Sequence, residues 1–260
     1  IEDDGRLLVC NVGWNWTASA YNTRVVFRNG IYGVVSSMKN IEDAHNDPNA
    51  LFIDIGAKSK EDALKYVHVG SVCGYCGEYL PLANDLVCSK TFDDRVGCFQ
   101  LIEALRENDG TYPNDIYYVF TVQEEVGCRG SKTTAAFIKP DIGIAVDVTP
   151  AHDYPCDLTG SNAIGEGIGI KVADPSVLCD EDVIAAMEQC CRHKDIPFQY
   201  EVIDKGGCDA SSMNLSNFGV RAGGISVVTR YAHCSSVISK EDAESGIRLC
   251  TAFSKYEFQF

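Results

Sequence analysis

The sequence is short of basic side chains, with 22 lysines and arginines against 37 aspartates and glutamates and a formal net charge of −15. A nucleic-acid groove needs a basic face that replaces phosphate counterions, so this balance argues against a nucleic-acid partner. No apolar run approaches the roughly 20 residues that cross a bilayer, and we expect no membrane partner. The acidic start at Ile1–Gly5 has neither the basic region nor the apolar stretch of a signal peptide.

A disulfide framework is not expected, although the sequence contains 13 cysteines. Their number is odd and their spacing irregular, and Cys98, Cys190 and Cys250 stand in apolar stretches where thiols act as small core hydrophobes. Disulfide frameworks are typical of short secreted domains rather than of chains this long. We therefore predict free thiols and a reducing, cytoplasmic location.

The first third of the chain has the pattern of a β-rich domain. Short runs such as Leu7–Val12, Arg24–Phe27 and Leu51–Ile55 are rich in β-branched and apolar residues and are separated by turn residues. Ser59 can cap one short helix. Residues 1–88 are predicted to form a small β-barrel or sandwich.

From residue 89 onward, predicted strands and helices alternate. The helical spacing of residues 96–106 places Cys98, Phe99, Ile102 and Leu105 on one apolar face, and strands are predicted at residues 116–122, 142–148 and 222–228. Apolar strands that alternate with helices are typical of an α/β sandwich with a largely parallel sheet. This region is predicted to form one domain over residues 89–260.

Polar side chains stand where these strands end, at Asp93, Glu124, Glu125, Asp147 and His233. Each has a simple structural explanation as a helix cap, a solvated turn or an ordinary polar contact. Active sites of open α/β sheets lie outside the carboxyl ends of the strands. The presence of all these residues at strand ends is less easily explained by chance than the position of any one of them. Clustered carboxylates repel one another unless cations neutralise them, and mixed carboxylate and imidazole ligands suit zinc, cobalt or manganese.

Longer motifs make the pattern specific: Phe92–Gly97, Val119–Gly127, Ile144–Pro150, Gly207–Ala210 and Ile225–His233. In these stretches, and in order along essentially the whole chain, the sequence resembles the TET or glutamyl aminopeptidase family of two-metal aminopeptidases, some of which are named cellulase M. The resemblance implies a three-layer α/β sandwich with a mixed, largely parallel sheet of the aminopeptidase/phosphorylase type. It also implies that the N-terminal region is a small β-barrel dimerisation domain and the remainder a metallopeptidase catalytic domain.

The resemblance implies two divalent metal ions per subunit, zinc or cobalt. Asp93 would bridge both ions, Glu125 and His233 would bind one, Asp147 would bind the other, and Glu124 would be the general base. The peptide bond after Asp93 is cis in relatives. Adjacent residues of a strand point to opposite sides, so Glu124 and Glu125 need a bend to share a site.

Further residues are implied to support this site. Asp94 and Arg95 would form an ion pair that holds the loop around the metal ligands. Asp209, Gly223 and Gly224 would be loop elements that line the substrate pocket, with a structural role as the alternative for Asp209.

One metal ligand of the family has no counterpart that we can assign in this sequence. A further ligand in the family is the histidine of a His-x-Asp motif just before the β-domain, and this chain opens at about that point, without Met. We therefore expect the N-terminal part of the catalytic domain to be missing, with weak or single metal occupancy and little activity for these 260 residues alone.

The leading hypothesis is a cytoplasmic metalloaminopeptidase that removes N-terminal residues from peptides. The resemblance implies homo-oligomers in which dimers build a tetrahedral dodecamer. A catalytically inactive, truncated relative that acts as an assembly or scaffold subunit is the first alternative. Glycoside hydrolysis by paired carboxylates is a weaker one.

Overall fold

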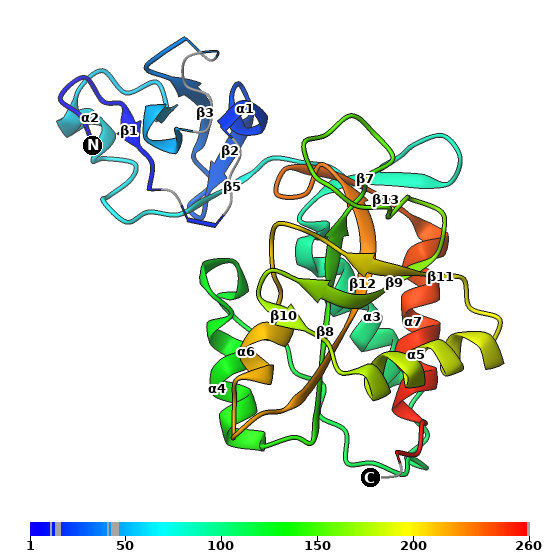
Figure 1. The fold of residues 1–260 in the computed structure, drawn as a ribbon. Helices are drawn as coiled ribbons and strands as arrows, with labels where there is room; N and C mark the ends of the chain where they lie inside the picture. The colour runs from blue at the N-terminus through cyan, green and yellow to red at the C-terminus, as the bar shows by residue number, and fades with distance from the viewer. Residues whose placement is uncertain (11, 14–16, 41, 43–46, 259–260) are drawn as a thin grey trace. The chain divides into compact units, whose positions relative to one another are not determined.

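The computed structural model describes residues 1–10, 12–13, 17–40, 42 and 47–258. The chain forms two compact units, Ile1–Glu78 and Tyr79–Phe260 (Figure 1). The boundary lies before the expected residue 88, because strand β7 (Leu86–Lys90) pairs with β6 (Leu80–Pro81) and with β13 (Ser235–Ser239). The segment just after the boundary is therefore part of the second unit's sheet.

The first unit is built on a five-stranded antiparallel sheet in the order β1-β4-β3-β2-β5. Alternate residues of its strands, among them Val25, Val35 and Ile53, face a buried core. Among the described residues no pairing joins β1 to β5. Its elements are β1 (Leu7–Leu8), α1 (Thr17–Ala20), β2 (Arg24–Phe27), β3 (Tyr32–Ser37), η1 (Pro48–Ala50), β4 (Leu51–Asp54), α2 (Lys60–Ala63) and β5 (Cys73–Tyr75).

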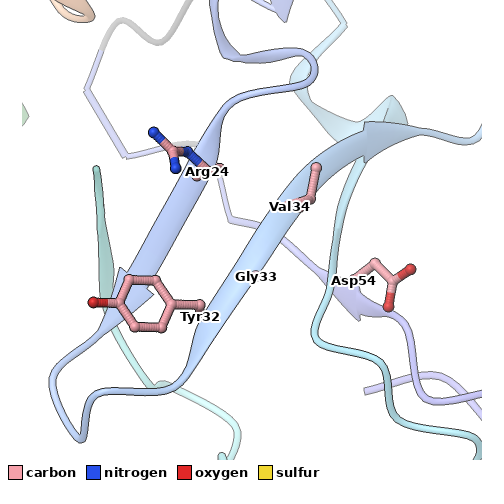
Figure 2. Close-up of a pocket in the computed structure, with 5 residues that line it drawn as sticks. All are labelled: Arg24, Tyr32, Gly33, Val34 and Asp54. Atoms are coloured by element: carbon pink, nitrogen blue, oxygen red, sulfur yellow. The ribbon is translucent and has the colours of Figure 1, made fainter. Parts of the chain in front are cut away.

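The other face of this sheet is exposed and carries a pocket. Strand register places Arg24, Val34 and Asp54 side by side across β2, β3 and β4. With Tyr32 and Gly33 they line a pocket of about 350 Å³, shown in Figure 2. None of these residues is predicted to take part in catalysis. The pocket's two opposite charges flank an apolar centre.

The second unit contains a mixed eight-stranded sheet. Its strands are hydrogen-bonded in the order β10-β9-β12-β13-β7-β6; in addition, β11 pairs with β9 and β8 pairs with β12. Among the described strands, only the β8–β12 and β9–β11 pairs are parallel, so the sheet is less parallel than expected. One reason is that β13 follows β12 after a short loop, whereas parallel pairing needs a crossover of a dozen residues or more. The remaining strands are β8 (Ile142–Pro150), β9 (Ile168–Asp174), β10 (Val177–Leu178), β11 (Phe198–Val202) and β12 (Arg221–Arg230).

Helices cover both faces of this sheet and make the expected three-layer sandwich (Figure 1). On one face, α3 (Phe92–Arg106), α5 (Glu181–His193) and α7 (Lys240–Ser254) share the main core with β9 and β12. On the other, α6 (Ala210–Asn214) packs on β8 and β12, beside α4 (Arg129–Ile138). Every described helix is too short or too polar to cross a bilayer.

Helix α3 turns a different face to the sheet from the one that its apolar pattern predicts. Val96 and Ala104 are buried, whereas Phe99, Ile102 and Leu105 are 49, 43 and 46% exposed. Small side chains let the helix lie close to β8, with which it makes many contacts. The apolar pattern therefore identifies the helix but not the side that packs.

The strand predicted at residues 116–122 is not formed. The segment is irregular and pairs with no described strand, although Gly130 N–H donates to the carbonyl of Val122 at 3.0 Å. A strand needs a neighbour with which its backbone groups can exchange hydrogen bonds, so apolar composition alone does not produce one. The segment still leads directly to Glu124.

Candidate metal centre

Asp93 and Asp94 lie at the start of α3, in a distorted first turn. Thr91 has a left-handed φ of 61°, and both aspartates have non-helical backbone angles. Their connecting peptide bond is cis, as the family resemblance implies. Gly97 N–H donates to Asp94 Oδ1 at 2.9 Å, and a Cβ at position 97 would collide with that carboxylate. Glycine is therefore needed three residues after Asp94, because a larger side chain would collide with the Asp94 carboxylate.

The bend required between Glu124 and Glu125 is present. Gln123 has a φ of 60°, and the 3₁₀ turn η2 (Glu124–Val126) follows it. The N–H groups of Gly127 and Cys128 both donate to the carbonyl of Glu124, at 2.9 and 2.8 Å. This turn takes the two glutamates out of strand alternation, so both can approach one site.

His233 joins two of the predicted ligands. Its Nε2 lies 3.2 Å from Asp93 Oδ2 and 3.4 Å from Glu125 Oε2. One ligand atom from each of these three side chains lies within 4.8 Å of the others. Segments distant in the sequence therefore meet at one point, on the loop after β12, the start of α3 and the turn η2.

Asp147 lies close to this group but outside it. It sits within β8, opposite Ser226, and the strand continues through Pro150 instead of ending at Asp147. Val148 N–H donates to its Oδ1 at 2.8 Å. Burial raises the pKa of Asp147 well above its usual range, and the negative charges of Asp94, Asp93 and Glu124 add to this. Asp147 thus shares the electrostatic field of the site.

The site is strongly acidic, and its carboxylates are held in unfavourable surroundings. Burial raises the pKa of Glu124 to about 7, with Asp209, Glu125 and Asp93 contributing. Burial and then Asp93 raise the pKa of Glu125, whereas His233 lowers it. A divalent cation removes this repulsion, and oxygen donors with one imidazole nitrogen are a donor set that zinc and cobalt accept. The residues present therefore fit a metal ion.

The support expected from Asp94 takes another form. Its carboxylate accepts the hydrogen bond from Gly97, and the ion pairs of the described residues include none between Asp94 and Arg95. Burial raises the pKa of Asp94 well above its usual range, with Asp93 adding to the effect. The expected ion pair is therefore wrong, because a neighbouring backbone N–H stabilises the aspartate instead.

Asp209 is held by hydroxyl groups. Thr121 Oγ1 donates to its Oδ2 at 2.7 Å and Ser131 Oγ donates to its Oδ1 at 2.5 Å. Ser131 Oγ also lies 2.6 Å from Ser212 Oγ. Both carboxylate oxygens are engaged, so Asp209 links the end of the 116–122 segment to α4 and α6.

Gly223 and Gly224 do not lie in a loop, so the loop position expected for them is wrong. Both are buried inside β12. A Cβ at Gly223 would come within 2.6 Å of Met187 Cε in α5, and one at Gly224 within 2.9 Å of Lys171 Cβ in β9. The pair allows a helix and a neighbouring strand's side chain to pack directly on the β12 backbone.

His-x-Asp sequences occur twice, at His45–Asp47 and His193–Asp195, yet neither matches the family position. His45 lies outside the described residues. His193 ends α5 and does not belong to the group that surrounds Asp93.

Sequence reasoning did not single out Cys128. Its thiol donates to Glu124 Oε1 at 3.3 Å, and Glu124, Cys128 and Asp209 form a second close group. The spacing of four residues from Glu124 is the signal that could have indicated this contact.

Comparisons with known proteins identify the family of this chain. The profile of the M42 glutamyl aminopeptidase family matches residues 1–249. A protein of Acetivibrio thermocellus with a provisional aminopeptidase name is 41% identical over 251 residues, which cover 96% of this chain and 76% of that protein.

Two solved structures extend the match to the fold. An aminopeptidase from the archaeon Desulfurococcus kamchatkensis has a TM-score of 0.90 at 35% identity, covering 99% of this chain and 75% of that one. The Pyrococcus horikoshii TET1 peptidase, described as able to assemble into a tetrahedron or a large octahedral shell, has a TM-score of 0.84 at 28% identity. It is covered to 78%, and this chain to 98%. This chain belongs to the M42 glutamyl aminopeptidase family.

Proposed function

We propose that this chain carries the catalytic site of a metal-dependent aminopeptidase that hydrolyses N-terminal residues from peptides, and that this site is centred on Asp93. The observation that supports this most is the position of His233 Nε2 between Asp93 and Glu125, inside an acidic cluster. A single histidine would offset only part of the repulsion among these carboxylates, whereas a bound divalent cation brings a larger positive charge to the site. Zinc or cobalt suits these donors.

The protein's side chains would divide the work as follows. Asp93, Glu125 and His233 would hold one ion, and Asp93 with Asp147 would hold the other. Bound divalent ions polarise a carbonyl and lower the pKa of water. Glu124 would take the proton of the attacking water on its carboxylate and pass it to the leaving amine.

The test of this function is a Glu124→Gln variant assayed on aminoacyl chromogenic substrates in the presence of zinc or cobalt. Loss of the base should lower kcat by roughly 10² to 10⁴-fold with a smaller change in KM. Glu78→Gln, at the end of the first unit, is the matched control and should keep wild-type rates. Unchanged kcat in Glu124→Gln would remove Glu124 from the mechanism, and wild-type hydrolysis that resists chelators would overturn metal dependence.

Metal stoichiometry is a separate expected outcome. The described residues supply three close donors for one ion, whereas Asp147 stands apart from the close group. We expect one ion to bind at least tenfold more tightly than the second, as measured by titration calorimetry and elemental analysis. Two ions bound with equal affinity would contradict this expectation.

We also propose a homo-oligomer of cytoplasmic location in which the first unit pairs subunits. The Pyrococcus horikoshii relative is described as a tetrahedral or octahedral assembly. In this chain, the row Arg24–Val34–Asp54 on the exposed sheet face carries a positive charge, an apolar centre and a negative charge. A twofold axis through Val34 would set each arginine against the partner's aspartate, so the face is self-complementary.

A further inference from the structure

Cys128 follows the turn that carries Glu124 and touches that glutamate twice. Its backbone N–H donates to the Glu124 carbonyl at 2.8 Å, and its thiol donates to Oε1 at 3.3 Å. Cys128 has a left-handed φ of 50° and comes directly before α4. The turn η2 therefore fixes the backbone of Glu124, and the start of α4 fixes the backbone of Cys128.

The thiol has the protonation state that a donor needs. Burial, together with the negative charge of Glu124, raises the pKa of Cys128 to about 12. The sulfur thus keeps its proton and is a poor nucleophile. Ser211 Oγ, in α6, lies 3.8 Å from the sulfur on another side and also donates to the carbonyl of Cys208.

The Glu124 carboxylate has three negatively charged neighbours. Asp209, Glu125 and Asp93 all repel it. Among the described residues, the only side-chain hydrogen bond that reaches its oxygens comes from Cys128. The hydrogen bond from the Cys128 thiol therefore orients the Glu124 carboxylate against the repulsion of these three carboxylates.

We propose that Cys128 is a positioning residue that holds the Glu124 carboxylate in the orientation needed for proton transfer. This inference rests on the proposed role of Glu124 as the general base. It assigns Cys128 no contact with substrate and no covalent chemistry. Its action is exerted through a single hydrogen bond to Oε1.

The test compares Cys128→Ala and Cys128→Ser in the full chain, with Cys76→Ala as a half-buried cysteine control in the other unit. Cys128→Ala should lower kcat about three- to tenfold with KM unchanged, since a single hydrogen bond is lost. Cys128→Ser keeps a hydroxyl donor and should recover most of the rate. Crystal structures of the variants supply a readout independent of activity, because Glu124 should change rotamer in Cys128→Ala and keep it in Cys128→Ser.

The possible failures are distinguishable. Wild-type kcat in Cys128→Ala, or an unmoved Glu124 in its crystal structure, would overturn the positioning role. Equal loss in the alanine and serine variants would do the same, because it would indicate a packing effect. If Glu124→Gln retains activity, or the wild-type chain hydrolyses nothing, the proposed function fails, and the Glu124 rotamers alone then decide whether the thiol positions that side chain.

Discussion

At the scale of single residues, the site is a set of acidic groups whose positions are set by short local contacts. Gly97 N–H holds Asp94, hydroxyls hold Asp209, and the Cys128 thiol holds Glu124. Such contacts offset part of the cost of gathering carboxylates. The remaining cost of burying carboxylates close together raises the pKa of Asp94, and the pKa of Glu124 is raised to about 7.

This raised pKa predicts a pH dependence for the metal-free protein. Between pH about 4.5 and 7, the folded protein binds a proton at Glu124 that the unfolded chain has released, so stability falls as pH rises through this window. Replacing Glu124 by glutamine should therefore raise Tm more at pH 8 than at pH 5, as measured by circular dichroism with a chelator present. An equal change in Tm at both pH values would contradict the shifted pKa.

At the scale of elements, the hydrophobic pattern predicts which segments are regular better than it predicts where they pack. The helix over residues 96–106 is formed, but α3 buries Val96 and Ala104 and exposes Leu105. The apolar segment at residues 116–122 is not a strand. In both cases, the outcome depends on which neighbour is available, and local sequence does not contain that information.

Mutation of Gly223 can test whether this glycine is needed for α5 to pack on β12. Gly223→Val should push α5 from β12 and destabilise the protein by about 1–3 kcal/mol, because Met187 and Val183 leave no room. Urea unfolding measures this effect. Gly74→Val, on β5 with no atom near its Cβ position, is the control. A shift in KM without loss of stability would restore the substrate-pocket role first expected for Gly223.

At the scale of the whole molecule, the two units have separate cores and separate sheets. The first presents the Arg24–Val34–Asp54 face, and the second contains the candidate metal centre. This division matches the proposal that assembly and catalysis are assigned to different units. It also means that either property can be removed by a substitution that leaves the other unit folded.

Assembly can be tested on that face. Val34→Asp would place an uncompensated carboxylate at the proposed twofold axis, and burying such a charge costs several kcal/mol. Light scattering after gel filtration should show large assemblies for the wild type and smaller species for Val34→Asp. Val69→Asp, at an exposed valine elsewhere in the same unit, should assemble normally. Assemblies of wild-type size in Val34→Asp would place the interface elsewhere, and a monomeric wild type would end the assembly proposal.

The sequence by itself determined the family, the α/β class and the identity of the side chains that gather at the centre, because these depend on residue types in short ordered motifs. It also indicated the bend at Glu124 and Glu125, since adjacent strand residues cannot otherwise share a site. Only the tertiary structure decided that His233 lies between Asp93 and Glu125 and that Gly223 packs against Met187 of α5. Those facts are distances between segments, and the packing of helices on a shared sheet sets them.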